Sequence, residues 1–336
     1  MAKRPQNLPA VKKLTEADSY FIDTTYAAGL QECFDPQHPL TRADDMKWKQ
    51  ALSDYARELF GIFGSEDGRE WAIPHSDFFE GLTGVDGTYF HNLEQMKRVG
   101  GVSVPLFEIV YRDSIALYGK YGFDITKSAE YVLYHVSIGR PLNYHDIPAH
   151  LYWKEAVAAP PASAPAQPTA DPALFTRADR GWAEGLHPFD RFVKNTYEIL
   201  SPLHELTAQM QLNQHQFLTP DRKVQRSVFG EGAARVEVIV NGSRKSFQHQ
   251  SKTGGTVLLP PYGFLIESPT FVAFHALTWN GLTYSAAPLF TLRSLDGKPL
   301  AQSANIRVFH GFGDARLKLG PLTHTVEKEA VLSHAP

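Results

Sequence analysis

The sequence predicts an α/β region followed by an antiparallel β-sandwich. Residues 18–153 alternate short apolar runs with stretches of helical periodicity, which is the order that parallel sheets use. After residue 221 the pattern changes to short β-prone runs separated by Asn-Gly, Gly-Gly and Asp-Gly turn signals. Between the two patterns, residues 156–172 are rich in Pro and Ala, so we expect an extended or disordered loop there.

The elements of the α/β region follow from these runs. Strands are expected at 20–24, 61–65, 71–74 and 104–111, and helices at 44–60, 91–99 and 126–137, the last stopped by Gly139 and Pro141. A further helix is expected at 189–210, with a kink or a break at Pro202. The strands of the sandwich are expected at 224–229, 235–240, 256–259, 264–268, 271–278, 289–292 and 306–309.

Composition limits the classes of function. A chain of 336 residues with 43% hydrophobic content can bury a large core, and a formal charge of −3 predicts no binding to nucleic acid or to an anionic membrane. Cys33 is the single cysteine, which excludes a disulfide framework and a multi-cysteine zinc site. The chain as written has no signal peptide and no apolar run long enough to span a membrane, so we expect a cytoplasmic protein unless the true start lies upstream.

Two acidic residues each end a strand-like run, Asp23 in the first and Glu66 in the second. A barrel enzyme places its acids in this way, at the mouth of the sheet. Because one helix separates the two runs, both acids should lie at the same end of adjacent or near-adjacent parallel strands. The neighbouring charge of Asp67 and an apolar wall from Phe60, Phe63 or Trp71 would raise the pKa of Glu66 toward the range of a general acid. The alternative for either acid is a helix cap or an ion pair.

Other polar and aromatic residues follow the same predicted strand ends and could contact a sugar, because a sugar ring stacks on aromatic side chains while its hydroxyls need donors and acceptors. These candidate substrate-binding residues are Trp71, His75, Asp77, Tyr111, Asp113, Tyr144 and His145. Helix capping is the alternative for Asp77 and Asp113, and an ordinary hydrogen-bonded role is the alternative for the histidines. No P-loop, dinucleotide fingerprint or Gly-x-Ser-x-Gly elbow occurs, which disfavours nucleotide chemistry and serine hydrolysis.

Four segments together carry a resemblance to a known family: Tyr-Phe-Ile-Asp-Thr-Thr at 20–25, and residues 63–71, 104–113 and 217–224. They resemble bacterial glycoside hydrolases of family 129 and of the related family 101, over nearly the whole chain. The resemblance implies a (β/α)8 TIM barrel followed by a β-sandwich, and cleavage of α-linked N-acetylgalactosamine with retention of configuration. Residues 1–215 would then be the C-terminal part of the barrel, 216–322 the sandwich and 323–336 a tail.

The resemblance also assigns roles to residues. It makes Asp23 the nucleophile and Glu66 the general acid/base, and relatives commonly have histidine where this chain has Arg112. It implies a calcium ion near the active site, without ligands that can be placed here, whereas the acid chemistry itself needs no cofactor. Members carry further barrel strands before the nucleophile, so an upstream polypeptide that completes the barrel is an expected partner.

The leading hypothesis is a retaining α-glycosidase that cleaves α-linked N-acetylgalactosamine, or a related sugar, by double displacement. Such a mechanism places the two carboxyl groups roughly 5 to 5.5 Å apart. One alternative is an inactive or carbohydrate-binding fragment of such an enzyme. Another is an α-galactosidase-type activity on the same scaffold, since the acids break the bond while other residues select the sugar.

Overall fold

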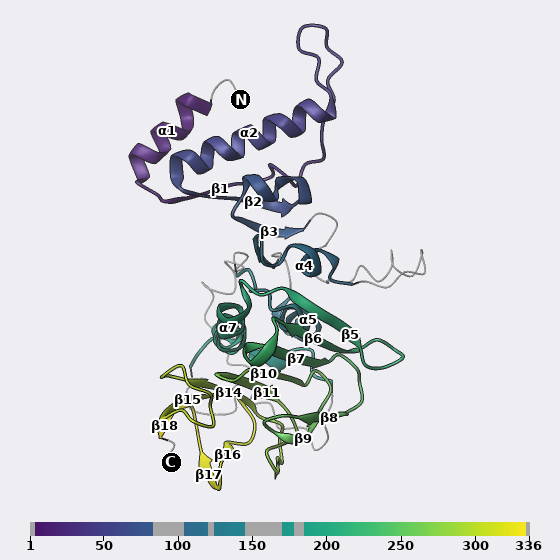
Figure 1. The fold of residues 1–336 in the computed structure, drawn as a ribbon, viewed down its shortest axis with the longest axis vertical. Coiled ribbons are helices and arrows are strands. Elements are labelled where there is room, and N and C mark those ends of the chain that lie inside the picture. The colour runs from purple at the N-terminus through teal and green to yellow at the C-terminus, as the bar shows by residue number, and fades with distance from the viewer. Residues whose placement is uncertain (1–3, 83–103, 120–123, 145–169, 178–184, 334–336) are drawn as a thin grey trace.

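The computed structural model describes residues 4–82, 104–119, 124–144, 170–177 and 185–333, which form two lobes joined at a narrow waist (Figure 1). The upper lobe in this view holds a parallel sheet with two helices on it. The lower lobe holds antiparallel sheets with two other helices. The described chain runs from the upper lobe to the lower one, so its two ends lie far apart.

Four parallel strands form the sheet of the upper lobe, in the order β1-β2-β3-β4. Helices α1 and α2 cover one face of it, and α4 precedes the last strand. The bounds are α1 (Arg4–Thr15), β1 (Ser19–Ile22), α2 (Arg42–Phe60), β2 (Ile62–Gly68), the 3-10 helix η1 (Glu70–His75), β3 (Phe78–Leu82), α4 (Leu106–Tyr111) and β4 (Ala116–Tyr118).

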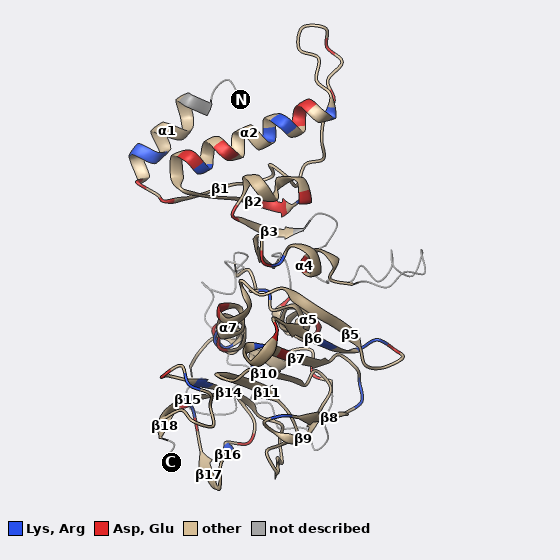
Figure 2. Ribbon diagram, in the orientation of Figure 1, with Lys and Arg blue, Asp and Glu red and all other residues tan. Residues whose placement is uncertain are grey.

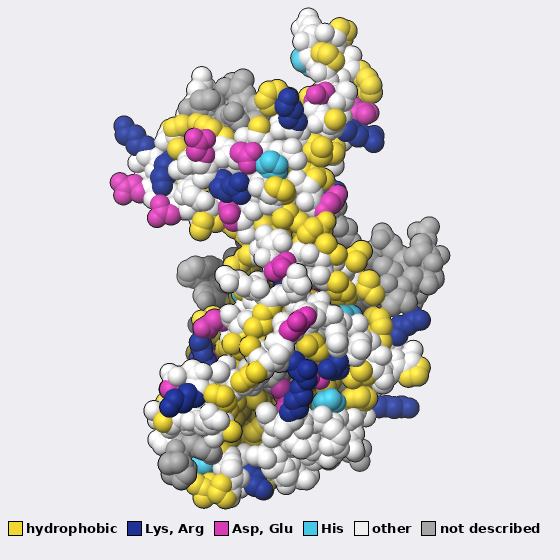
Figure 3. Space-filling model, viewed as in Figure 1, with side chains coloured by type: hydrophobic (Ala, Val, Ile, Leu, Met, Phe, Trp, Pro, Cys, Tyr) yellow, Lys and Arg dark blue, Asp and Glu magenta, His cyan; other side chains and the backbone are white. Residues whose placement is uncertain are grey.

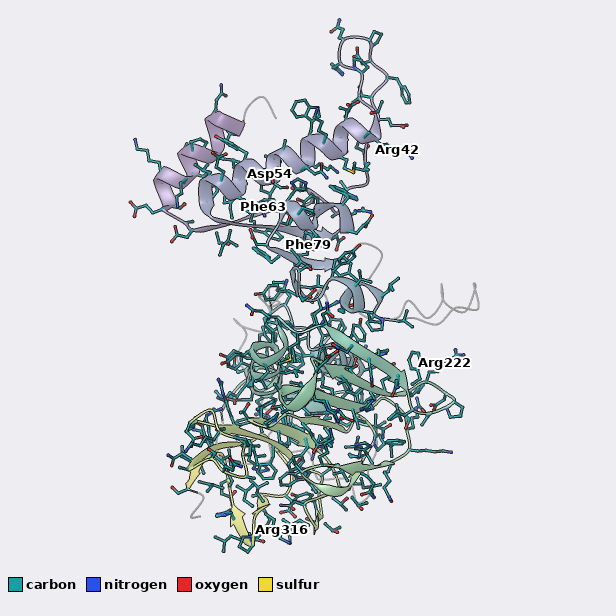
Figure 4. All side chains as sticks on the ribbon, viewed as in Figure 1. Arg42, Asp54, Phe63, Phe79, Arg222 and Arg316 are labelled. Atoms are coloured by element: carbon teal, nitrogen blue, oxygen red, sulfur yellow. The ribbon has the colours of Figure 1, made fainter. Side chains whose placement is uncertain are left out.

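Helix α2 is defined at both ends by its sequence. Thr41 and Asp44 form a capping box at its start, and Gly61, with φ 100°, ends it. Acidic and basic residues alternate in groups along it (Figure 2). Phe63 and Phe79, which Figure 4 labels, are fully buried and pack in one apolar cluster with Ala56 and Phe60 of α2. The helical face of the sheet is therefore a closed apolar layer.

The lower lobe is consistent with a β-sandwich. An eight-stranded antiparallel sheet has the order β18-β15-β14-β11-β10-β7-β6-β5, and a four-stranded sheet, β13-β12-β9-β8, packs against one of its faces. The bounds are β5 (Leu212–Phe217), β6 (Val224–Phe229), β7 (Val236–Asn241), β8 (Phe247–Ser251), β9 (Gly255–Leu259), β10 (Phe264–Glu267), β11 (Phe271–His275), β12 (Thr278–Trp279), β13 (Leu282–Thr283), β14 (Leu289–Ser294), β15 (Asn305–His310), β16 (Arg316–Leu319), β17 (Leu322–Thr325) and β18 (Glu329–Ser333).

Two helices cover the other face of the large sheet. Helices α5 (Ala129–Ile138) and α7 (Pro188–Thr207) pack on it in one apolar cluster that includes Phe192, Val238 and Phe264. Short 3-10 helices, η2 (Ile125–Lys127), η3 (Leu174–Thr176) and η5 (Gly232–Ala234), lie in the connections. The large sheet is thus covered by helices on one face and by strands on the other.

Most predicted elements are present, including all seven sandwich strands, the first two parallel strands and the helices expected at 44–60 and 126–137. Two predicted strands are wrong. Residues 71–74 belong to η1, and 104–111 fold as α4 because their apolar residues also fit a helical period. The expected break at Pro202 is also wrong, since α7 continues through it.

The structure does not describe two of the expected segments in full. The helix expected at 91–99 and most of the Pro/Ala-rich segment 156–172 lie outside the described residues. The segment 323–336, expected as a tail, contains β18, which pairs with β15. The parallel sheet has the strand order expected of part of a barrel, while the barrel itself stays a prediction. None of the helices in the described ranges is both long and apolar enough to cross a membrane.

Candidate active site

The face of the parallel sheet opposite α2 carries two rows of side chains. The register places Phe21, Gly64 and Phe78 side by side on β1, β2 and β3. Two positions further along the strands, and therefore on the same face, Glu66 of β2 is level with Glu80 of β3. The second row is the closer of the two to the carboxyl ends of the strands, where barrel enzymes place their chemistry.

The first row is aromatic. The ring of Phe78 lies 6.1 Å from that of Phe21 and 6.2 Å from that of Tyr118, measured between ring centroids. Gly64 allows this arrangement, because a Cβ added there would lie 2.4 Å from the ring of Phe78. We call Phe21, Phe78 and Tyr118 the aromatic row.

The second row is acidic. Glu66 and Glu80 are each 7% exposed, and Glu80 accepts a hydrogen bond from Nδ2 of Asn143. Asp23 directly follows Ile22, the last residue of β1, whose partner is Ser65, and lies in the turn after that strand. Asp23 is exposed, and its Oδ1 accepts a hydrogen bond from the backbone N–H of Thr24 at 2.9 Å. We call Asp23, Glu66 and Glu80 the carboxyl row.

A cavity of about 480 Å³ opens beside these rows. The aromatic row and Glu80 line it from the sheet, and a segment after α5 lines it from the other side. The residues of that segment are Leu142, Asn143 and Tyr144. An apolar wall with a few polar groups is typical of a site for a sugar, whose ring stacks while its hydroxyls form hydrogen bonds.

The apolar wall expected around Glu66 is not where the sequence placed it. Phe60, Phe63 and Trp71 pack in the cluster beneath α2, on the helical face of the sheet. Phe63 is an odd number of positions from Glu66 along β2, so the two side chains point to opposite faces. The aromatic side chains on the same face as Glu66 are those of the aromatic row.

The structure separates the other predicted substrate-binding residues. Tyr144 lines the cavity, donating or accepting a hydrogen bond of 2.6 Å with Thr196, and burial raises the pKa of Tyr144 to about 12. Trp71 and His75 lie on the helical side, where Nδ1 of His75 is 2.8 Å from the carboxylate of Asp54. His145 lies outside the described residues.

Asp77, Tyr111 and Asp113 lie near the amino ends of the strands, at the opposite edge from Glu66. Asp77 precedes β3 and accepts a hydrogen bond from the backbone N–H of Phe63 at 2.9 Å. Asp113 precedes β4, is exposed and accepts from Gln211, and the ring of Tyr111 packs on Phe107. Asp77 and Asp113 line a second cavity, of about 240 Å³. The structure therefore does not bring these residues to the carboxyl row.

Arg112 is held by hydrogen bonds within the structure. Its guanidinium donates to the carbonyl oxygens of Ile138, Gly139 and Thr207 and to the hydroxyl of Thr207, at 2.6 to 3.3 Å. These acceptors lie at the C-terminal ends of α5 and α7, where a cation is favourable. Burial lowers the pKa of Arg112 to about 10, so it stays charged at neutral pH. Arg112 therefore joins the end of α4 to the lower lobe.

Glu80, Asn143 and the aromatic row were not among the predicted site residues. The signal for Glu80 was available, since Phe78-Phe79-Glu80 is an apolar run that stops at an acid. The runs before Asp23 and Glu66 also stop at an acid. Asn143 had no such signal, because its position depends on how the segment after α5 crosses the sheet.

Calcium ligands cannot be assigned from the described residues. They contain no group of three or more His, Cys, Asp or Glu side chains arranged to hold a metal ion. The calcium ion that the resemblance implies stays a prediction, and no step below uses it.

Comparisons with known proteins give structural similarities only. No family model and no curated protein matches the chain. The structure is similar to α-N-acetylgalactosaminidase NagBb from Bifidobacterium bifidum. For the ligand-free form the identity is 20% and the TM-score 0.43, over 71% of this chain and 32% of that chain; for the GalNAc complex the identity is 18% and the TM-score 0.44, over 71% of this chain and 33% of that chain. The structure is also similar to the cyclic α-maltosyl-(1→6)-maltose hydrolase from Arthrobacter globiformis, with 13% identity and a TM-score of 0.37 over 81% of this chain and 59% of that chain. The chain spans about a third of the length of NagBb.

Proposed function

We propose that this chain carries the catalytic acids of a retaining α-glycosidase that acts on α-linked N-acetylgalactosamine or a related sugar. The observation that supports it is the arrangement of the first two strands: β1 and β2 are adjacent and parallel, Glu66 lies on β2, and Asp23 directly follows Ile22, the last residue of β1, whose partner on β2 is Ser65. Neighbouring strands lie about 4.8 Å apart. This spacing suits a retaining mechanism, whose carboxyl groups are about 5 to 5.5 Å apart.

The proposed reaction has two steps. In the first, a carboxylate oxygen of Asp23 bonds to C1 of the sugar while the C1–O bond to the leaving group breaks, and Glu66 gives its proton to the leaving oxygen. In the second, Glu66 takes a proton from water, the water oxygen bonds to C1, and the ester bond to Asp23 breaks. Both acids return to their starting states.

The environments of the two acids suit these different roles. Asp23 is exposed and accepts a backbone N–H, which favours its charged form. Glu66 is buried, and burial favours the neutral form that can donate a proton. The aromatic row and the cavity beside it would hold the sugar ring.

One observation favours a second candidate, a sugar-binding fragment without turnover. The face that carries the two rows is open, because Phe21 and Tyr118 are each 39% exposed and Ile62 is 48% exposed. In addition, β1 is an edge strand of its sheet. We propose that strands from another polypeptide would pair with β1 and close this face, since closure removes the edges of a barrel.

Incubation with an aryl α-N-acetylgalactosaminide tests the proposal. Release of the aryl group by the chain alone, or only when a polypeptide supplying further barrel strands is co-expressed, supports the glycosidase. Binding of the sugar without release in both cases supports the second candidate. An aryl α-galactoside, run in parallel, tests the α-galactosidase-type alternative.

The nucleophile is tested by Asp23→Ala, which should abolish turnover. Added azide should restore glycosyl transfer with an inverted product, because azide attacks C1 from the side that Asp23 vacates. Asp18→Ala is the matched control, since Asp18 is an exposed acid just before β1 that pairs with Lys12. Full activity of Asp23→Ala would contradict the proposed role.

A further inference from the structure

Glu66 has another acid directly beside it in the carboxyl row. The register pairs it with Glu80 on β3, and the two positions are on the same face of the sheet. Asp23 follows the last residue of β1, the strand on the other side of β2. The protonation of Glu66 and Glu80 is therefore a property of two coupled groups.

One contact of Glu80 favours its charged form. Glu80 accepts a hydrogen bond from the amide of Asn143, which can donate to a carboxylate and so offsets the cost of burying the charge. Asn143 comes from the segment after α5 and also lines the cavity, so a separate element holds Glu80. Besides Glu80, the titratable groups among the described residues that line the cavity are Tyr118 and Tyr144, and none of those residues is Lys, Arg or His.

Two carboxyl groups at neighbouring positions on adjacent strands disfavour simultaneous ionisation. We propose that Glu80, fixed by Asn143, is a positioning residue whose negative charge keeps the proton on Glu66. This inference rests on the role of general acid proposed for Glu66, and it extends it by naming the group that controls its protonation. Glu80 needs no contact with the reacting atoms to act in this way.

The test measures protonation directly, without turnover. The full chain is labelled with ¹³C at the Glu side-chain carboxyl carbon, and its pH titration is followed by NMR. Signals of Glu66 and Glu80 are assigned by their loss in Glu66→Gln and Glu80→Gln. In the unaltered chain, Glu66 should titrate above the ordinary glutamate value of about 4.3.

Removal of the neighbouring charge should lower that midpoint. In Glu80→Gln the titration of Glu66 should move to lower pH by about one unit or more, a tenfold change in its ionisation constant. Glu66→Gln should move the titration of Glu80 in the same direction, because the coupling is mutual. Glu267→Gln is the matched control, since Glu267 is an equally buried glutamate of β10 in the large sheet, and it should leave both midpoints unchanged.

The outcomes separate this inference from the proposed function. An ordinary midpoint for Glu66, or one that Glu80→Gln does not move, overturns the inference even when the chain hydrolyses the aryl glycoside. Coupled titration of Glu66 and Glu80 in a chain that releases no aryl group under either condition supports the inference and contradicts the proposed glycosidase activity. If Glu80→Gln does not fold, the reciprocal measurement in Glu66→Gln decides, and an unmoved midpoint of Glu80 there overturns the inference. In an active chain, Glu80→Gln should also move the alkaline limb of kcat/KM to lower pH, which a purely structural role would not do.

Discussion

Replacement of Arg112 by methionine should weaken the connection between the two lobes and lower the free energy of unfolding. Methionine keeps the length and the apolar stem of the side chain and removes the guanidinium. Three carbonyl oxygens at the ends of α5 and α7 then lose a donor, as does the hydroxyl of Thr207. The contact of the guanidinium with the ring of Phe229, 4.8 Å away, is lost as well.

The structure sets the size of the effect. Each buried acceptor that is left without a donor costs about 1 to 3 kcal/mol. The sum overstates the change, because removal of the charge also ends the cost of burying it. We therefore expect the free energy of unfolding to fall by about 3 to 5 kcal/mol, the range for removing one partner from a buried charged network.

Urea unfolding followed by circular dichroism measures this change, and limited proteolysis reports whether the connection between α4 and α5 becomes accessible. Arg293→Met is the matched control. Arg293 forms an exposed ion pair with Glu205, with Nη2 at 2.8 Å from both carboxylate oxygens, and such surface pairs contribute less than about 1 kcal/mol.

The reasoning is refuted if Arg112→Met lowers the free energy of unfolding no more than Arg293→Met does. Arg112→His is a second informative variant, because histidine can also carry a positive charge but has fewer donors. One imidazole cannot reach acceptors at the ends of two helices, so this variant should lose most of the same stability.

Two further predictions concern packing and pH. Gly64→Ala should displace the ring of Phe78 and lower stability by about 1 to 3 kcal/mol in thermal unfolding; Gly29→Ala, which meets no atom within 4 Å, should not, and equal effects would contradict the packing argument. Burial lowers the pKa of His275 to about 3, whereas in the unfolded chain this histidine has a pKa of about 6.5. The unfolded chain therefore binds a proton that the folded chain does not, and the free energy of unfolding decreases as the pH falls below about 6.5. Between pH 7 and pH 5 the loss due to His275 should be about 2 kcal/mol, so His275→Gln should lose about that much less stability over this range than the unaltered chain; equal losses in the two would rule it out.

Local signals explain why much of the fold was predictable. Turn signals on both sides fixed strand 224–229 to the residue, and the helical period of the apolar residues placed the start of α2 within two positions. Strand β3 was missed because Phe78 and Phe79 face different layers, one the cavity and the other the core, so no alternation of polar and apolar residues is visible.

The site was predictable only where the sequence determines it locally. Asp23 and Glu66 were selected because each ends a strand run; β1 and β2 are adjacent and parallel, as expected, while the catalytic roles of the two acids stay predictions. The positions of Asp77 and Asp113 were not, because an acid before a strand and an acid after one look alike until the strands themselves are known. Asn143 meets Glu80 from a segment 63 positions later, a contact that no short pattern contains.

Helix α5, which covers the large sheet, is translated well before the strand on which it packs. Helix α5 ends at Ile138, and β7, on which it packs, starts at Val236. At about 5 to 20 residues per second, a ribosome needs roughly 5 to 20 s to add the intervening residues. All residues of α5 except Glu130 have little exposure in the folded chain, so during this interval an apolar helix has nothing to cover. The nascent protein should therefore be prone to aggregate, and it should depend on chaperones, until the last strands of the lower lobe emerge.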